Sequence, residues 1–196
     1  MPARLIYLMG PSGSGKDSVI DAARDALHRL DVDVARRVIT RSAESVGEHA
    51  IGVSPQAFER MRRDAEFAMN WHANGLQYGI QRDINLRLAQ GASVLVNGSR
   101  AYLPQALAQY PQLLPILLTV DTQVLRLRLE ARGRETPEQI DQRLQRNERL
   151  QSDPAVWEEG AVRIEALDNS ADLQGAVQRL LALLARHGIS AAKDRI

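Results

Sequence analysis

Short apolar runs alternate with amphipathic stretches along the chain. The clearest runs are Leu5–Met9, Ser93–Val96 and Leu113–Val120. Runs of this length and continuity are typical of strands buried on both faces of a parallel sheet. Between them, apolar residues recur every three or four positions, which predicts helices that pack through one face. The alternation therefore predicts an α/β fold, in which a parallel core sheet is flanked by helices and ligands bind at the carboxyl ends of the strands.

Capping signals set several of the expected helix boundaries. Ser54 followed by Pro55 is a helix start, and Thr136-Pro137-Glu138-Gln139 is a capping box with proline at the first helical position. The expected helices cover about 16–30, 55 onward, 82–90, 103–109, 121–132, 136–150 and 171–186. Further short strands are expected at 38–39, 66–71 and 162–166, an exposed loop with edge strands at 43–53, and a turn at 75–79.

The length of 196 residues suits a single domain with a sizeable core. We expect a core of residues 1–39 and 80–196, an inserted lobe of about 40–79 and a helical lid of about 132–150. The net charge of +1 gives no general attraction to nucleic acid or membranes. The absence of cysteine excludes disulfides and thiolate metal sites. With no stretch of membrane-spanning length and no signal peptide, we expect a cytoplasmic protein.

The first apolar run leads into a phosphate-binding pattern, G-x-x-x-x-G-K, and an amphipathic helix follows. Glycines let the backbone curl so that its N–H groups point at an anion, and the helix N-terminus adds a positive dipole end. Lys16 would reach the β- and γ-phosphates of a nucleotide. A Gly/Ser-rich linker is the alternative, but a linker has no reason to separate a buried strand from a strong helix. The expected nucleotide-binding residues are Gly10, Pro11, Ser12, Gly13, Ser14, Gly15, Lys16, Asp17 and Ser18.

Asp17 departs from the usual pattern, because Ser or Thr normally follows the lysine and ligates Mg²⁺. The carboxylate expected at the end of a core strand is replaced here by neutral Asn97. Our hypothesis is that the carboxylate has been relocated and that Asp17 holds Mg²⁺ directly or through water. The four histidines have no spacing suited to a metal, and we assign none to them.

Arginines cluster around Gly133, where one predicted helix breaks and the next begins. Phosphoryl transfer needs cations spread around the phosphates, and such a corner can close as a lid. We expect Arg132, Arg134 and Arg143 to stabilise the transferred charge. For Arg126, Arg128 and Arg149 we favour a solvated surface paired with Glu130, Glu138 and Glu148. Tyr78 can donate its hydroxyl to an acceptor phosphate, although a half-buried core tyrosine is the plainer interpretation.

The motifs together resemble the guanylate kinase fold group of P-loop NTPases. The resemblance spans about residues 5–150 and rests on the P-loop, Thr40-Arg41, Gly47-Glu48, Phe67, Tyr78-Gly79, Asn97 and the lid residues Arg132-Gly133, Ile140 and Arg143. It implies that residues 40–79 bind the acceptor, with Arg41 and Tyr78 on its phosphate. A guanylate kinase that phosphorylates GMP is therefore one candidate. A kinase-like fold without catalysis that serves as a binding module is another.

Finer details resemble the ribose 1,5-bisphosphate phosphokinases of phosphonate degradation. They are Lys16-Asp17-Ser18, Phe67-Ala68 with Trp71, Gly75–Ile80, Val96–Arg100 and Arg132–Glu135. This resemblance implies transfer of the ATP γ-phosphate, with Mg²⁺, to the 1-phosphate of ribose 1,5-bisphosphate, giving 5-phosphoribosyl 1-diphosphate and ADP. Asn70 and Asn97 stand where guanylate kinases use acids to bind guanine, which argues against GMP. In this interpretation Arg100 serves the second phosphate and Asn97 a ribose hydroxyl, and the expected partner is a sugar phosphate.

Overall fold

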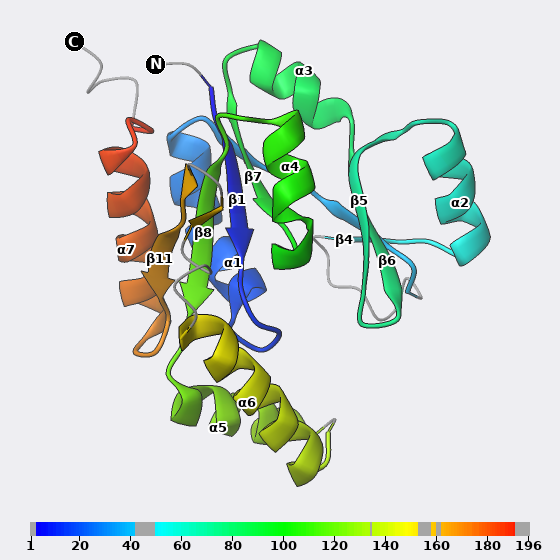
Figure 1. Cartoon of the computed structure of the whole chain (residues 1–196). Coiled ribbons are helices and arrows are strands. Elements are labelled where there is room, and N and C mark those ends of the chain that lie inside the picture. Colours follow the sequence, from blue (N-terminus) through cyan, green and yellow to red (C-terminus); the bar gives the residue numbers. More distant parts are fainter. Residues whose placement is uncertain (1–2, 42–49, 134, 153–157, 160–161, 191–196) are drawn as a thin grey trace.

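The computed structural model describes residues 3–41, 50–133, 135–152, 158–159 and 162–190. Its core is a five-stranded sheet in which every neighbouring pair of strands is parallel, as predicted. The spatial order is β11 (Glu165–Asp168), β8 (Leu114–Thr119), β1 (Leu5–Met9), β7 (Ser93–Asn97) and β2 (Val32–Val34). The P-loop follows β1, at the centre of the sheet (Figure 1).

The two faces of β1 pack against different pairs of helices. Ile6 and Leu8 are buried against α1 (Lys16–Arg29) and α7 (Leu173–Arg186). Tyr7 and Met9 are buried in a second cluster with α3 (Asp83–Ala89) and α4 (Leu103–Gln109). All five residues of β1 are buried, which is why this strand reads as a continuous apolar run.

A second sheet projects from the core on the side of α3 (Figure 1). Its strands are β4 (Ala50–Gly52), β3 (Arg37–Ile39), β6 (Leu76–Gln81) and β5 (Phe67–Ala73) in that order, and α2 (Pro55–Arg63) belongs to the same region. This sheet lies within residues 37–81, which correspond to the inserted lobe predicted at about 40–79 and which we call the acceptor lobe. The lobe begins at residue 37, three residues before the predicted boundary at 40. The Ser54 cap is confirmed, because the Ser54 hydroxyl accepts a hydrogen bond from the Ala57 amide at 3.1 Å.

The prediction of a turn at residues 75–79 is wrong. The turn is Asn74-Gly75, both with positive φ, and Leu76 to Gln81 form β6. Two successive positive φ values make a tight hairpin whose twist matches the flanking strands. Position 79, inside this strand, requires glycine because a Cβ there would come within 2.4 Å of the Phe67 ring. Tyr78 therefore points from a rigid strand rather than from a loop.

The segment predicted as a lid, about 132–150, falls largely on α6 (Pro137–Ser152), which forms a helical hairpin with α5 (Thr122–Arg132) below the sheet in Figure 1. We call this hairpin the lid. Asp121 caps α5, and Thr136 and Gln139 exchange the two hydrogen bonds of the predicted capping box. Gly133 ends α5 in the left-handed region, with φ 59°. The helices share a small apolar cluster of Val120, Leu125, Leu129, Ile140 and Leu144.

Short elements complete the described chain. The strand β2 was not predicted, because its three residues, Val-Asp-Val, are too few to show a period. The strand expected at 162–166 is divided into β10 (Val162–Arg163), which pairs with β9 (Glu158–Glu159), and β11 in the core. A 3₁₀ turn, η2 (Arg100–Tyr102), follows β7. Of the loop expected at 43–53, residues 42–49 lie outside the described residues. None of the described helices has the length and apolarity needed to cross a membrane.

Candidate active site

A cleft of about 960 Å³ lies at the carboxyl ends of β1 and β7, between the core, the acceptor lobe and the lid. It brings together residues far apart in the sequence. The P-loop residues other than Ser14 line it, and so do Arg41, Tyr78, Asn97, Arg100 and Arg132. Arg37, Trp71 and Asn147 also line it, and we did not predict these three as site residues. The cleft is therefore the place where donor and acceptor groups would meet.

The P-loop backbone depends on glycine at two positions. Gly13 and Gly15 have φ 96° and 92°, in the left-handed region. A Cβ on Gly13 would lie 2.9 Å from the Leu129 side chain, and one on Gly15 would lie 2.6 Å from Asn169 Nδ2. The loop is thus packed from behind by the lid helix and by the end of β11, which leaves its front open to the cleft.

Arg128 and Asn169 hold the loop in place. The Ser14 carbonyl accepts hydrogen bonds from Asn169 Nδ2 at 2.7 Å and from Arg128 Nη1 at 3.2 Å. Arg128 Nη2 donates to the Asn169 carbonyl at 2.9 Å. Our assignment of Arg128 to the solvated surface is therefore wrong.

The helical period accounts for this result. Arg128 lies one helical turn after Val124, which packs against the cluster of Leu125 and Leu129, whereas Arg126 lies on the other flank of that cluster. Arg126 pairs with Asp141 at 2.5 Å and with Glu130 at 3.9 Å, as expected for a charged surface. The side chain of Arg149 lies outside the described residues.

Lys16 bends back onto its own loop. Its ammonium donates to the carbonyls of Gly10 at 2.7 Å and Pro11 at 3.0 Å. Burial lowers the pKa of Lys16 to about 8. The carboxylate of Asp17 opposes this shift in pKa, and the charges of Arg37 and Arg132 reinforce it. Phosphates entering the loop would satisfy the ammonium and favour its charged form.

Asp17, in the first turn of α1, forms hydrogen bonds with side chains from β3 and β7. Its Oδ1 accepts hydrogen bonds from Arg37 Nη2, on β3, at 2.7 Å and from Asn97 Nδ2, at the end of β7, at 2.8 Å. Asn97 is 5% exposed, and its buried Oδ1 has no partner among the described residues. The Asp17 side chain is 72% exposed and Arg37 only 20%.

The donor set of this site is compatible with Mg²⁺ bound together with a nucleotide. No group of three or more His, Cys, Asp or Glu side chains that could hold a metal occurs in the described part of the chain. Mg²⁺, however, takes one or two carboxylates, substrate phosphates and waters. Asp17 is exposed and lines the cleft, so its carboxylate is the protein group that would hold the ion.

Tyr7 fixes the end of β7 from beneath. Its hydroxyl donates to the Ser99 carbonyl at 2.8 Å and accepts from the Ser99 amide at 3.0 Å. Burial raises the pKa of Tyr7 far above its usual value, so the hydroxyl stays protonated and remains a donor. A Cβ on Gly98 would come within 2.2 Å of the Tyr7 ring. The ring therefore sets the path of residues 97–100, which carry Asn97 and Arg100.

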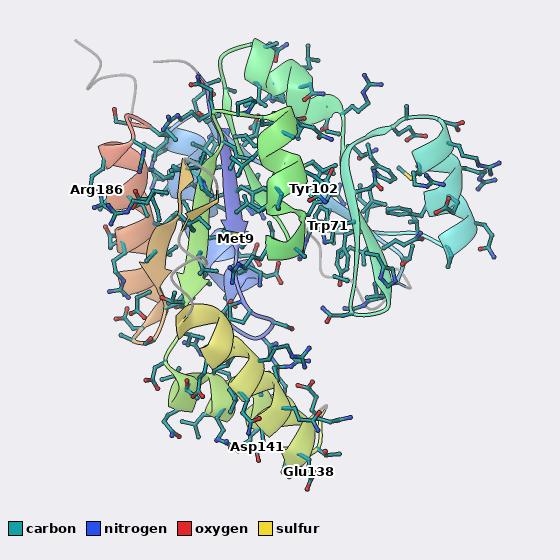
Figure 2. All side chains as sticks on the ribbon, viewed as in Figure 1. Met9, Trp71, Tyr102, Glu138, Asp141 and Arg186 are labelled. Atoms are coloured by element: carbon teal, nitrogen blue, oxygen red, sulfur yellow. The ribbon has the colours of Figure 1, made fainter. Side chains whose placement is uncertain are left out.

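Two stacked aromatic side chains, Trp71 and Tyr78, line the lobe side of the cleft. Trp71 lies on Tyr78 with ring centroids 5.7 Å apart and planes 5° from parallel. Tyr102 meets the indole of Trp71 at 5.7 Å from the core side (Figure 2). Neighbouring Asn70 is exposed and is not among the lining residues. Asn70, which we took to stand where guanylate kinases carry an acid, thus points away from the cleft, because side chains alternate along β5 and Trp71 faces the cleft instead.

The lid arginines differ in their contacts. Arg132 is exposed and lines the cleft. Arg143 is paired with Glu135 at 2.5 Å and is not among the lining residues. Asn147, one turn further along α6, is 6% exposed and lines the cleft. Arg134 lies outside the described residues.

Solved structures show the class of fold. The guanylate kinase of Anaplasma phagocytophilum superposes with a TM-score of 0.66 at 14% identity, covering 95% of this chain and 87% of that one. A gluconokinase of Sinorhizobium meliloti superposes with a TM-score of 0.52 at 25% identity, covering 94% and 93%. With the P-loop and its cleft, these similarities define a P-loop kinase with a guanylate kinase-like fold.

Relatives in sequence define the family. The chain is 54% identical over 191 residues to ribose 1,5-bisphosphate phosphokinase of Pseudomonas fluorescens. The alignment covers 97% of this chain and 99% of the relative. It is 55% identical to the enzyme of the same name from Pseudomonas paraeruginosa, covering 94% and 96%. No family model matches the chain. The chain belongs to the ribose 1,5-bisphosphate phosphokinase family.

The lowered pKa of Lys16 predicts a pH dependence of nucleotide binding. Below about pH 8 the ammonium is charged, so affinity for ADP should be nearly constant. Above that pH the free protein loses the charge, and the Kd for ADP should rise by about tenfold per pH unit. Calorimetry in buffers of different ionisation enthalpy should show proton uptake near pH 8. A Lys16→Ala variant that keeps the same profile would contradict the assignment.

The contacts of Arg128 predict a positioning role. Arg128→Gln removes the charged donors to the carbonyls of Ser14 and Asn169 and should lower the free energy of unfolding by about 2 kcal/mol. It should also raise the KM for ATP by roughly tenfold, because the loop loses its support. Arg126→Gln on the same helix removes only exposed ion pairs and should change stability by less than about 1 kcal/mol. Urea unfolding and steady-state kinetics compare the two, and equal effects would contradict the role.

Proposed function

We propose that this protein transfers the γ-phosphoryl group of ATP to the 1-phosphate of ribose 1,5-bisphosphate, giving 5-phosphoribosyl 1-diphosphate and ADP. The observation that carries the proposal is the composition of the cleft. Among its described lining residues, five cationic side chains accompany a single carboxylate, that of Asp17. Such a site suits two substrates that bring several phosphate groups and no cationic group.

On the donor side, the P-loop amides and Lys16 would hold the β- and γ-phosphates. Lys16 would then exchange the carbonyls of Gly10 and Pro11 for phosphate oxygens, its proton being retained. Arg132, which already lines the cleft, would stabilise the charge in transfer. Arg134 and Arg143 keep their predicted roles as lid cations, and Arg143 would have to leave Glu135 to act.

On the acceptor side, Arg41 and the Tyr78 hydroxyl would bind one phosphate and Arg100 the other. Asn97 would contact a ribose hydroxyl. A 1-phosphate oxygen would attack the γ-phosphorus with its own lone pair while the bond from the γ-phosphorus to the β–γ bridging oxygen breaks. The released electron pair stays on ADP, so an ionised acceptor needs no general base.

A magnesium ion held by Asp17 and the donor phosphates would neutralise charge on the β- and γ-phosphates. The side chains around Asp17 bear on this role. Arg37 and Asn97 donate hydrogen bonds to Oδ1, so Oδ2 would be the oxygen available to the ion.

Among the described residues that line the cleft, no carboxylate is free to take the N–H groups of a guanine base. A guanine base is recognised by acceptors that take its N–H groups, and desolvating those groups without partners is costly. Asp17, the one carboxylate among the lining residues, is already bonded to Arg37 and Asn97. The described lobe side offers a tryptophan and a tyrosine instead, a surface suited to a sugar ring.

A coupled assay tests the proposal against its rivals. ADP release with ribose 1,5-bisphosphate should exceed that with GMP by at least about 100-fold in kcat/KM. Phosphorus NMR should show the diphosphate of the product. Lys16→Ala should lose about 1,000-fold or more in kcat with an unchanged melting temperature. Strong GMP turnover would establish a guanylate kinase, and absence of ATP binding would indicate a binding module.

The role of Asp17 has its own test. Asp17→Asn keeps the shape but removes the charge, and should weaken Mn²⁺ binding in the ADP complex by about tenfold or more. Electron paramagnetic resonance of Mn²⁺ measures this without turnover. Asp21→Asn, one turn later on α1 and paired with Arg24, is the matched control. Unchanged Mn²⁺ affinity in Asp17→Asn would refute metal ligation.

A further inference from the structure

Arg37 is a cation of the acceptor lobe that reaches the P-loop. It is the first residue of β3, where Val38 is buried in the lobe while Arg37 and Ile39 line the cleft. Its guanidinium spans from the lobe to the carboxylate that directly follows Lys16. The lowered pKa of Lys16, to which the charge of Arg37 contributes, is consistent with this closeness. Arg37 therefore lies beside the place where the donor phosphates bind.

The Arg37 guanidinium is fixed by Asp17, but most of its N–H donors have no hydrogen-bond partner among the described residues. Its single hydrogen bond to Asp17 uses Nη2, and no other partner occurs among the described residues. A guanidinium carries five N–H donors, and a side chain only 20% exposed gives water little access to the others. Donors that are half-buried, charged and turned to a cleft are costly to leave unpaired. A bound anion would satisfy them.

The position of Arg37 also matches the electrostatic problem of the reaction. An acceptor phosphate must approach the γ-phosphate of the donor in line, and both groups are anions. Their repulsion grows as closure excludes water. Arg41 and Arg100 also line the cleft, but Arg37 is the one bonded to the P-loop residue next to Lys16.

Resting on the function proposed above, we propose that Arg37 binds the acceptor phosphate and holds it against the donor phosphates, with Asp17 as its positioning residue. The Asp17–Asn97 contact fixes the carboxylate, and the carboxylate fixes the orientation of the guanidinium. The remaining N–H donors then form a fork of the geometry that phosphate oxygens prefer. The alternative is that the ion pair only fastens the lobe to the core.

Two substitutions separate these roles. Arg37→Gln removes charge and fork, and Arg37→Lys keeps the charge but not the fork. The matched control is Arg36→Gln, the exposed neighbouring arginine that does not line the cleft. Kinetics with ribose 1,5-bisphosphate give kcat and KM, and calorimetry gives the Kd for ADP and, on the ADP-loaded protein, for ribose 1,5-bisphosphate.

We expect Arg37→Gln to lose at least about 100-fold in kcat/KM for ribose 1,5-bisphosphate while the Kd for ADP stays within about threefold. Arg37→Lys should lose about tenfold, and Arg36→Gln should match the wild type. When the binding of ribose 1,5-bisphosphate is measured without a divalent metal, Asp17→Asn should weaken it in the wild-type background but add nothing in the Arg37→Gln background, since Asp17 then acts on the acceptor only through Arg37.

Each of three outcomes would overturn the inference. They are an Arg37→Gln variant that matches Arg36→Gln, one that loses affinity for ADP as much as for the acceptor, and an Arg37→Lys variant that retains full activity. If Arg37→Gln does not fold, the comparison of Arg37→Lys with the control decides. A wild type that neither binds nor phosphorylates ribose 1,5-bisphosphate would refute the proposed function itself, which is a different result.

Discussion

The site depends on a backbone curve that side chains would prevent. Gly13 and Gly15 adopt left-handed conformations, and the volume where their side chains would lie is filled by Leu129 and Asn169. The same neighbours belong to the lid helix and to the end of β11, so the lid and sheet shape the loop from behind. Arg128 ties both to the Ser14 carbonyl. The phosphate cradle is therefore a property of the packed fold rather than of the loop sequence alone.

Much of this was predictable because the signals are local. The continuous apolar run of β1, the cap at Ser54 and the capping box at Thr136 each determine an element by short-range chemistry. The P-loop is recognisable from its G-x-x-x-x-G-K spacing between a strand and a helix, a pattern that is rare outside phosphate-binding loops. The lobe was harder, since a Tyr-Gly pair suits a turn as well as a strand. The pairing of Tyr78 and Gly79 with β3 on one side and with β5 on the other, both distant in the sequence, decides for the strand.

The residues that we missed are those whose roles depend on partners distant in the sequence. Arg128 lies 114 positions from the Ser14 carbonyl that it holds, and Arg37 lies 20 positions from Asp17. Periodicity contained part of the answer, because Arg128 follows the partly buried Val124 by one helical turn, and Arg37 shares a strand face with Ile39. Such patterns tell which way a side chain points. They do not tell what it meets, which is why Trp71 also went unassigned.

The aromatic stack of Trp71, Tyr78 and Tyr102 acquires its meaning from the charges around it. A concentration of cations draws in polyanions of every kind from a distance, and added salt weakens that attraction for all of them alike. Long-range charge thus speeds the arrival of any polyanion but distinguishes poorly among them. A flat ring surface, by contrast, accepts or rejects a shape at contact distance. We therefore expect the rings of Trp71 and Tyr78 to add selectivity to the attraction that the cations supply.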